Sequence, residues 1–264
     1  LADLVSYQTK NNDQPYPFGP SDGGSDDNMS WDSGGDPALR RQRLRNLWAI
    51  LMLSRGVPMV VAGDEFGRTQ NGNNNPWALD SPAMRNNYAM IATSAPQRVA
   101  VEDGTGAAYH DNLGVFDSRD ERVNPLFRFA TFLMRLRHRH PALCRAAWGD
   151  LEAGGEDVSY LFRTPDGDGS PREGDRALAV HIDAPDDGFW VMINMSPDPV
   201  DFRVPAAGGG DVWRRLVDTA VGSEKDDNCW PEGEGEIVAD GVAVQPWSVV
   251  VWHRSPSPRP GAAR

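Results

Sequence analysis

The stretch GVPMVVAGDEFGRTQNGNNN, residues 56–75, decides the fold that we predict. Residues 57–62 form a short apolar run with three β-branched positions, which is typical of a strand buried on both faces of a parallel sheet. The run stops at Gly63, and acids, an arginine and amides follow it. A buried strand with polar side chains at its carboxyl end is typical of the active-site edge of an α/β barrel or an open α/β sheet.

The same stretch allows a plainer interpretation, which the sequence leaves open. Gly-Asp-Glu after a strand is also the pattern of a turn in which Asp64 caps a helix. The three asparagines at 73–75 could form a solvated loop, because loops are polar for many reasons.

Composition excludes some classes of function. The chain of 264 residues has a net charge of -12. Nucleic-acid binding is not expected, because no basic stripe is present to contact phosphates. The basic clusters at 40–45 and 135–140 lie in helical patterns and are predicted to be solvated helix faces. No apolar run approaches the ~18 residues of a membrane span, so no membrane partner is expected.

The two cysteines and the first residues give little about the cellular context. Cys144 and Cys229 are too few for a disulfide framework, although one bridge between them stays open. The sequence begins at Leu1 in mid-element, so we expect a fragment. Localisation and oligomeric state are therefore left open.

Two helices are predicted before residue 141. The first opens at Asp36 with Pro37 at its first position, has apolar residues at helical spacing, and runs to Ser54. The second is strongly amphipathic, begins at Asn124 and stops at His140, which precedes a proline. A helix followed by a buried strand is half of a repeating β/α unit.

The texture of the sequence changes near residue 150. Short β-rich runs then alternate with clusters of Pro, Gly and Asp, a pattern that indicates an antiparallel β-sandwich. Residues 255–264 are a Pro/Ser/Arg tail that we predict to be disordered. The predicted strands are 158–163, 177–183, 188–195, 200–204, 212–218 and 249–252.

Residues 10–35 form a long loop without hydrophobic periodicity. A loop of this length in a compact domain is usually functional or disordered. Tyr16, Phe18 and Trp31 argue against disorder, because aromatic rings seek packing partners or a ligand. Their rings could stack on a sugar, or they could pin the loop to the rest of the domain, and both roles stay open.

Motifs for metals, phosphates and nucleophiles are missing from the sequence. No Cys/His cluster has zinc spacing, and no phosphate loop or nucleophile elbow occurs. Residues 166–170 begin like a calcium loop but lack its glycine at the sixth position, so we predict a turn there. No cofactor and no metal site are expected.

The carboxylate pair Asp64–Glu65 is a poor catalytic pair. Glycoside hydrolysis needs two carboxyl groups roughly 5–9.5 Å apart across one bond, whereas adjacent residues point in different directions. We expect the pair to hold a loop, through Arg68. An unrelated hydrolase using His110 and Asp64 is a further hypothesis, although no nucleophile is positioned with them.

Six motifs in order resemble the isoamylase and glycogen-debranching branch of the α-amylase superfamily, glycoside hydrolase family 13. The segment RHRHPAL at 137–143 also looks like the end of that family's last barrel helix. The six motifs are LADLVSY at 1–7, PFGPSDGG at 17–24, NMSWD at 28–32, RRQRLRN at 40–46, GVPMVVAGDEFGRTQ at 56–70 and NNN at 73–75.

The resemblance implies a fold of class α/β plus all-β. Residues 1–147 would be the C-terminal part of a (β/α)8 TIM barrel, the end of unit 7 and unit 8, with an insertion at about 76–123. Residues 148–254 would form an antiparallel β-sandwich, and 255–264 the tail.

The resemblance also implies a function. The parent enzyme would hydrolyse α-1,6-glucosidic linkages in glycogen or amylopectin by a retaining mechanism. The three catalytic carboxylates of the family precede the segment that resembles residues 1–4, so no catalytic residue is assigned here and the fragment alone is expected to be inactive. A branched α-glucan is the expected partner. The candidate substrate-binding residues are Asp64, Arg68, Asn73, Asn74, Asn75, Tyr16, Phe18 and Trp31.

A non-catalytic role is the alternative. Residues 150–254 could be a carbohydrate-binding module, or a scaffold for the barrel. A binding module would need a line of exposed aromatic rings on one sheet face, whereas rings in alternating strand positions are more often core. The rings that could supply such a line are Trp190, Trp213, Trp230, Trp247 and Trp252.

Overall fold

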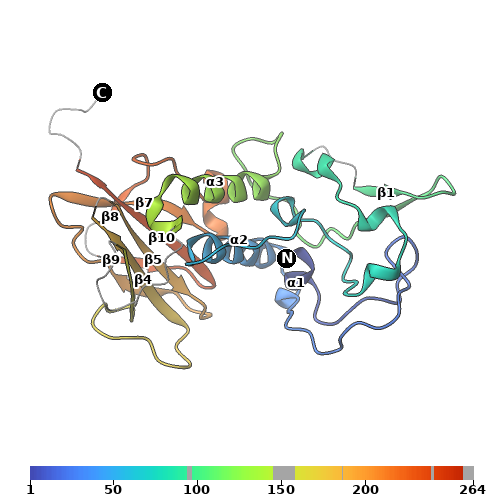
Figure 1. Ribbon diagram of the computed structural model, residues 1–264, viewed down its shortest axis with the longest axis horizontal. Helices are drawn as coiled ribbons and strands as arrows, with labels where there is room; N and C mark the ends of the chain where they lie inside the picture. Colours follow the sequence, from blue (N-terminus) through green and yellow to red (C-terminus); the bar gives the residue numbers. More distant parts are fainter. Residues whose placement is uncertain (94–96, 145–157, 186, 239–240, 258–264) are drawn as a thin grey trace. The chain divides into compact units, whose positions relative to one another are not determined.

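The computed structural model describes residues 1–93, 97–144, 158–185, 187–238 and 241–257 (Figure 1). The chain divides into two compact units, one made of residues 1–45 and 59–131 and the other of residues 46–58 and 132–264. No helix in the described ranges has both the length and the apolar character that crossing a bilayer requires.

The first unit consists mostly of loops joined by short elements. It includes the start of a long helix α2 (Pro37–Leu53) and the start of α3 (Pro125–Arg139). Its other elements are α1 (Ala2–Ser6), the 3₁₀ turns η1 (Ser33–Gly35), η2 (Asp64–Phe66), η3 (Pro76–Ala78), η4 (Pro82–Met84) and η5 (Tyr88–Ile91), and the antiparallel hairpin β1 (Arg98–Ala100) and β2 (Gly106–Ala108).

The structure confirms both predicted helices, and each begins with a side-chain cap. The Asp36 carboxylate accepts a hydrogen bond from the backbone N–H of Ala38 at 2.9 Å. The Asn124 side-chain oxygen accepts from Leu126 at 2.9 Å and from Phe127 at 3.3 Å. Such caps satisfy backbone donors that have no partner in the first turn of a helix.

The prediction of a buried strand over residues 57–62 is wrong for this structure. These residues form no strand, and the side chains of Val57 and Met59 are 89% and 86% exposed. A strand exists only where a neighbouring backbone accepts and donates its hydrogen bonds. Within the described ranges no segment pairs with residues 57–62, so apolar, β-branched composition alone cannot make this run a strand.

The second unit is built on antiparallel sheets. Its six-stranded sheet has the order β3-β4-β5-β10-β7-β8, and a separate sheet pairs β6 with β9. The strands are β3 (Ser159–Arg163), β4 (Ala177–Ala184), β5 (Asp187–Asn194), β6 (Val200–Arg203), β7 (Asp211–Asp218), β8 (Ile237–Val238), β9 (Gly241–Val244) and β10 (Ser248–Pro256); a short helix α4 (Pro141–Cys144) and a 3₁₀ segment η6 (Val221–Asp226) complete the unit.

All six strands that the sequence predicts are confirmed, whereas β8 and β9 in this unit and the hairpin β1–β2 in the first unit were not predicted. Strand β10 continues to Pro256. The prediction of a tail from residue 255 is therefore wrong at its first two residues, because these pair with the start of β7. Residues 258–264 lie outside the described ranges.

One apolar core lies between the large sheet and the β6–β9 pair. Trp190, Trp213 and Trp252 from the large sheet share it with Phe202 of β6 and Val244 of β9. Because these three indole side chains are almost fully buried, they do not form the exposed aromatic line that a carbohydrate-binding module would need. That alternative loses three of its five rings.

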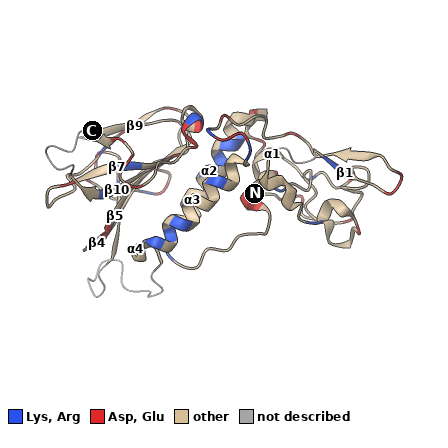
Figure 2. Ribbon diagram, turned by 90° about the horizontal axis from the view of Figure 1, so that it is seen from above, with Lys and Arg blue, Asp and Glu red and all other residues tan. Residues whose placement is uncertain are grey.

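Lys and Arg positions line α2 and α3 (Figure 2), but not all of these side chains are solvated. The side chains of Arg41, Arg45 and Arg137 are buried, which corrects the expectation that both clusters are solvated helix faces. Arg137 donates hydrogen bonds to the carbonyl oxygens of Met52 at 2.6 Å and Ser54 at 2.8 Å, and also to that of Gly56. It thereby satisfies acceptors at the carboxyl end of α2 that have no partner within the helix.

The two cysteines are not joined. Both Cys144 and Cys229 carry free thiols, and the Cys144 thiol donates to the Arg137 carbonyl oxygen at 2.6 Å. The bridge that the sequence left open is therefore not formed in this structure.

Candidate functional site

All eight predicted substrate-binding residues lie in the first unit, three on loop 10–35, two on the turn that contains η2 and three on loop 71–75. Asn73 makes the central contact. Its buried side chain donates to the Phe18 carbonyl oxygen at 2.7 Å and accepts from the Ser21 hydroxyl at 3.1 Å. A buried amide with satisfied donors and acceptors fixes loop geometry, because breaking it leaves unpaired polar groups.

The next two asparagines extend this contact. The Asn74 side chain donates to the Ser25 carbonyl at 2.9 Å and to the Asn28 side chain at 2.8 Å. Asn75 donates to the Asp22 carbonyl at 2.5 Å. The amide triplet therefore holds loop 10–35 against loop 71–75, and each of the three side chains donates at least one N–H group in doing so.

Asp64 and Arg68 lie on the turn that contains η2. The Asp64 carboxylate lies 2.7 Å from the Leu1 nitrogen, and Arg68 donates to the Met84 carbonyl at 2.9 Å. Glu65 accepts a hydrogen bond from the Gly63 backbone at 2.8 Å. Among the described residues no ion pair links Arg68 to either acid, so the expected pairing is not present there.

Gly63 fits this turn because it has no side chain. Its φ is +102°, and a Cβ atom at this position would lie 2.6 Å from Arg68 Cδ and 2.7 Å from Arg68 Cβ. We expect Gly63→Ala to lower the free energy of unfolding of this unit by the left-handed backbone cost, about 1–2 kcal/mol, plus about 1–3 kcal/mol of overpacking. Urea denaturation followed by circular dichroism measures the loss.

Gly104→Ala is the matched control for this substitution. Gly104 also has a positive φ, +79°, but a Cβ atom there meets nothing within 4 Å. It should therefore show the backbone cost alone. Equal losses for the two variants would contradict the role given to the close approach of Arg68.

The three aromatic residues of loop 10–35 have different surroundings. Phe18 is only 3% exposed and packs edge-to-face on Tyr109 at a ring separation of 5.4 Å. It has the packing role that the sequence left open as the alternative. The Arg43 guanidinium lies over the Trp31 ring, with its carbon 4.5 Å from the ring centroid. Tyr16 is 46% exposed, so it is the ring of the three that is most open to a ligand.

A pocket of about 450 Å³ lies in the same unit. None of the eight predicted residues lines it. His110 lines the pocket but Asp64 does not, so the pair that the unrelated-hydrolase hypothesis needs is not assembled there. Burial raises the pKa of Tyr109, an effect that Arg68 partly offsets. The Tyr109 hydroxyl is therefore a neutral hydrogen-bonding group at neutral pH. The residues that line the pocket include Phe66, Thr69, Tyr109, His110, Asp111 and Asn112.

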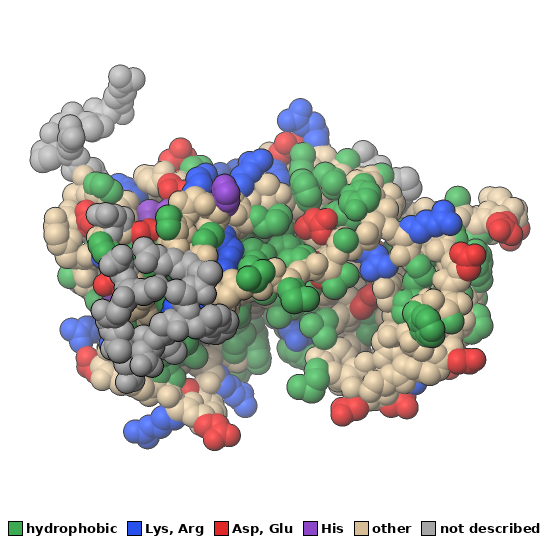
Figure 3. All heavy atoms as spheres, in the orientation of Figure 1, with side chains coloured by type: hydrophobic (Ala, Val, Ile, Leu, Met, Phe, Trp, Pro, Cys, Tyr) green, Lys and Arg blue, Asp and Glu red, His purple; other side chains and the backbone are tan. Residues whose placement is uncertain are grey.

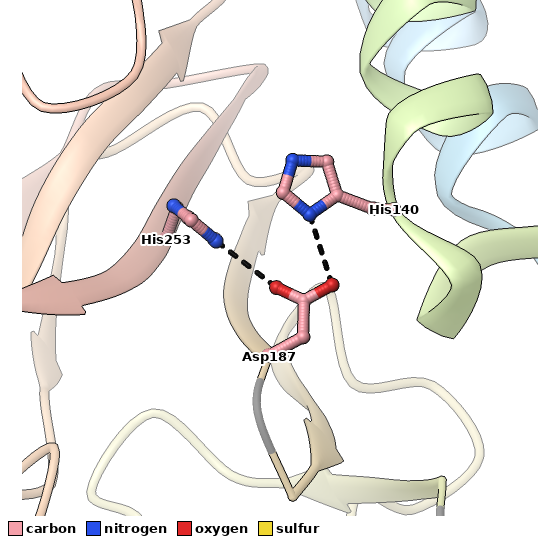
Figure 4. A group of neighbouring side chains, drawn as sticks. All are labelled: His140, Asp187 and His253. Atoms are coloured by element: carbon pink, nitrogen blue, oxygen red, sulfur yellow. Dashed lines mark hydrogen bonds and ion pairs between the residues drawn. The ribbon is translucent and has the colours of Figure 1, made fainter.

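A group that the sequence did not reveal lies in the second unit (Figure 4). The two carboxylate oxygens of Asp187, at the start of β5, contact His140 Nδ1 at 2.9 Å and His253 Nε2 at 3.0 Å. Burial by itself raises the pKa of Asp187, but the two imidazoles outweigh it and hold that pKa far below its ordinary value.

His140 responds in the opposite sense. Burial lowers its pKa, but Asp187 and Glu232 outweigh burial, so the net shift is upward. The three residues are 47 and 66 positions apart in the chain. No spacing motif could have found them. The fold brings them together through the strand register, which pairs His253 with Phe189, two residues after Asp187.

Known proteins resemble this chain over most of its length. No protein-family model matches it. An isoamylase of Flavobacterium sp. is 34% identical over 246 residues, covering 91% of this chain and 28% of that protein. An isoamylase of Pseudomonas amyloderamosa is 29% identical, covering 91% of this chain and 27% of that protein.

Two further proteins are also similar to this chain. A GlgX homolog of the glycogen operon of Mycobacterium tuberculosis is 29% identical, covering 83% of this chain and 30% of that protein. A solved alpha-amylase of Geobacillus thermoleovorans is 12% identical with a TM-score of 0.44, over 84% of this chain and 34% of that chain; this similarity is too weak to support an argument. The chain is a homologue of the isoamylases and of GlgX proteins, and it spans less than a third of the length of these curated relatives.

Proposed function

We propose that this chain is the C-terminal part of an isoamylase-type glycoside hydrolase that cleaves α-1,6-glucosidic branch linkages in glycogen or amylopectin. The observation that supports the proposal is the 34% identity to an isoamylase over 91% of the chain. Retaining hydrolysis needs two carboxyl groups on either side of the scissile bond. In our proposal, parts of the enzyme outside these residues supply them.

The proposal includes a fold for the whole enzyme. Residues 1–147 would complete a (β/α)8 barrel as the end of unit 7 and unit 8, with an insertion at about 76–123, and residues 148–254 would form the β-sandwich. The exposure of Val57 and Met59 supports this, because an apolar run at 57–62 is suited to a barrel interior. In the complete barrel that run would pair with neighbouring strands.

The loops of the first unit would then border the glucan cleft. Asp64 and Arg68 follow the run at 57–62 directly, and the asparagine triplet holds loop 10–35 beside them. We propose that these residues shape the cleft by fixing its loops, and that Tyr16 offers the open ring on which a glucose unit stacks. A sugar ring has an apolar face that suits an aromatic ring.

A debranching assay tests the proposed function. The complete reading frame should release linear chains from amylopectin, measured as new reducing ends together with loss of branch points, whereas the 264-residue chain should release none. Amylopectin left branched by the complete protein would overturn the proposal. Turnover by the 264-residue chain alone would overturn the part of it that places the carboxyl groups elsewhere.

The stacking role of Tyr16 is tested by Tyr16→Ala in the complete protein. We expect KM for amylopectin to rise about 3–10-fold with kcat little changed. An aromatic contact contributes about 0.5–1.5 kcal/mol beyond the burial of apolar area, and this contact would be made equally in the enzyme–substrate complex and in the transition state. Tyr88→Ala is the control, since Tyr88 is also exposed but lies outside loop 10–35. Equal KM values for the two variants would remove Tyr16 from the site.

A further inference from the structure

Three side chains in the second unit place metal-ligand atoms close together from separate elements. His140 follows α3, Asp187 begins β5 and His253 lies on β10 (Figure 4). One ring nitrogen from each histidine and a carboxylate oxygen all lie within 4.8 Å of one another. Two imidazole nitrogens and one carboxylate oxygen are a donor set found in zinc sites that keep a fourth position open.

The separations suit a small ion. Ligand atoms at about 2.0–2.1 Å from zinc in a tetrahedral arrangement lie roughly 3.3 Å from one another. The Asp187 oxygens already lie 2.9 Å from His140 Nδ1 and 3.0 Å from His253 Nε2. These contacts are made by different carboxylate oxygens, Oδ2 to His140 and Oδ1 to His253, so one oxygen that ligates the ion together with both nitrogens requires the Asp187 carboxylate to turn as well as the two rings.

The second nitrogen of His140 supplies an independent observation. His140 Nε2 is buried without a hydrogen-bond partner, and its nearest charged neighbour is a Glu232 carboxylate oxygen at 3.5 Å, which also pairs with Arg139. If neutral His140 donates from Nδ1 to Asp187, the Nε2 lone pair faces a carboxylate. An ion on Nδ1 puts the proton on Nε2, where Glu232 can accept it, and a ligating histidine typically has such a carboxylate partner.

We propose that His140, Asp187 and His253 form a binding site for one divalent transition-metal ion, with zinc as the occupant. Imidazole favours transition metals over calcium and magnesium, which take oxygen ligands. The site links the segment after α3 to strands β5 and β10, which pair from Ser248–Asn194 to His253–Phe189. The ion would thus stabilise the fold of this unit, independently of the proposed hydrolase function.

Zinc binding to the 264-residue chain tests the proposal. The protein is treated with a chelator, desalted, and titrated with zinc chloride by isothermal calorimetry. We expect one ion per chain and, at a zinc concentration about a hundredfold above Kd, a rise in melting temperature of about 5 °C or more. Cobalt ion is a second probe on the unaltered chain, because a tetrahedral site gives it visible absorption that zinc should abolish.

Variants assign the site. Asp187→Asn and His253→Ala should each weaken zinc binding at least about tenfold. His138→Ala is the control and should leave zinc binding unchanged, because His138 is an exposed residue of α3, two positions before His140. Circular dichroism without zinc shows whether each variant is folded. If a variant is not folded, the cobalt spectrum of the unaltered chain decides whether the site binds a metal ion. A chain that takes up no zinc and gives no tetrahedral cobalt band, or folded variants that bind as tightly as the unaltered chain, would show that the group is only a hydrogen-bond network.

Discussion

Trp252→Ala is expected to lower the free energy of unfolding of the second unit by about 3–5 kcal/mol, the usual cost of removing a large buried aromatic side chain. Trp252 is 1% exposed and lies opposite Trp190 in the register of β10 and β5. Its ring belongs to the core between the two sheets, with the Arg215 guanidinium 5.9 Å from its centroid. The substitution leaves a cavity in the middle of that core, and the surrounding strands can collapse into it only in part.

Urea denaturation followed by far-ultraviolet circular dichroism measures this loss. Trp77→Ala is the matched control, because Trp77 is the same residue type and is largely exposed. Its substitution should change the free energy of unfolding by no more than about 0.5 kcal/mol. If both variants lost the same amount, the core between the sheets could not be as the structure shows it.

Arg137→Met is the second substitution with a large expected effect, about 3–5 kcal/mol. It keeps much of the apolar stem but removes the guanidinium that donates to the carbonyl oxygens of Met52, Ser54 and Gly56. A hydrogen bond to a charged group contributes about 1.5–3 kcal/mol, and water can replace only part of this at a buried site. The positive charge also lies near the negative end of the α2 dipole.

The control for this charge is Arg135→Met. Arg135 lies on the same helix but is exposed, so its loss should cost little. The midpoints of urea unfolding for the two variants give the comparison. A small effect at Arg137 would mean that the carboxyl end of α2 does not depend on it.

Much of the local structure follows from the sequence alone. Both long helices begin where Asp36 and Asn124 predict, because a cap residue and a following proline determine a helix start locally. The six predicted strands of the second unit also lie where alternation and turn residues place them. The two-residue strand β8 and the glycine-led β9 are too short and too weakly patterned to be read without their partners.

The remainder depends on which backbone lies next to which. Residues 57–62 have the composition of a strand, but pairing decides whether they form one, and composition does not encode the partner. Phe18 and Asn73 were chosen for their chemistry, yet burial gives the ring a packing role and the amide a role in joining loops. The His140–Asp187–His253 group exists only because the sheet brings distant positions together.

The exposed run at 57–61 has a consequence for handling this chain. Val57, Met59 and Val61 are each more than 60% exposed, and apolar side chains reach the surface on the face drawn as spheres in Figure 3. Exposed apolar segments with high β-propensity promote aggregation. Static light scattering should therefore rise faster than linearly with protein concentration, and a mild non-ionic detergent should suppress that rise.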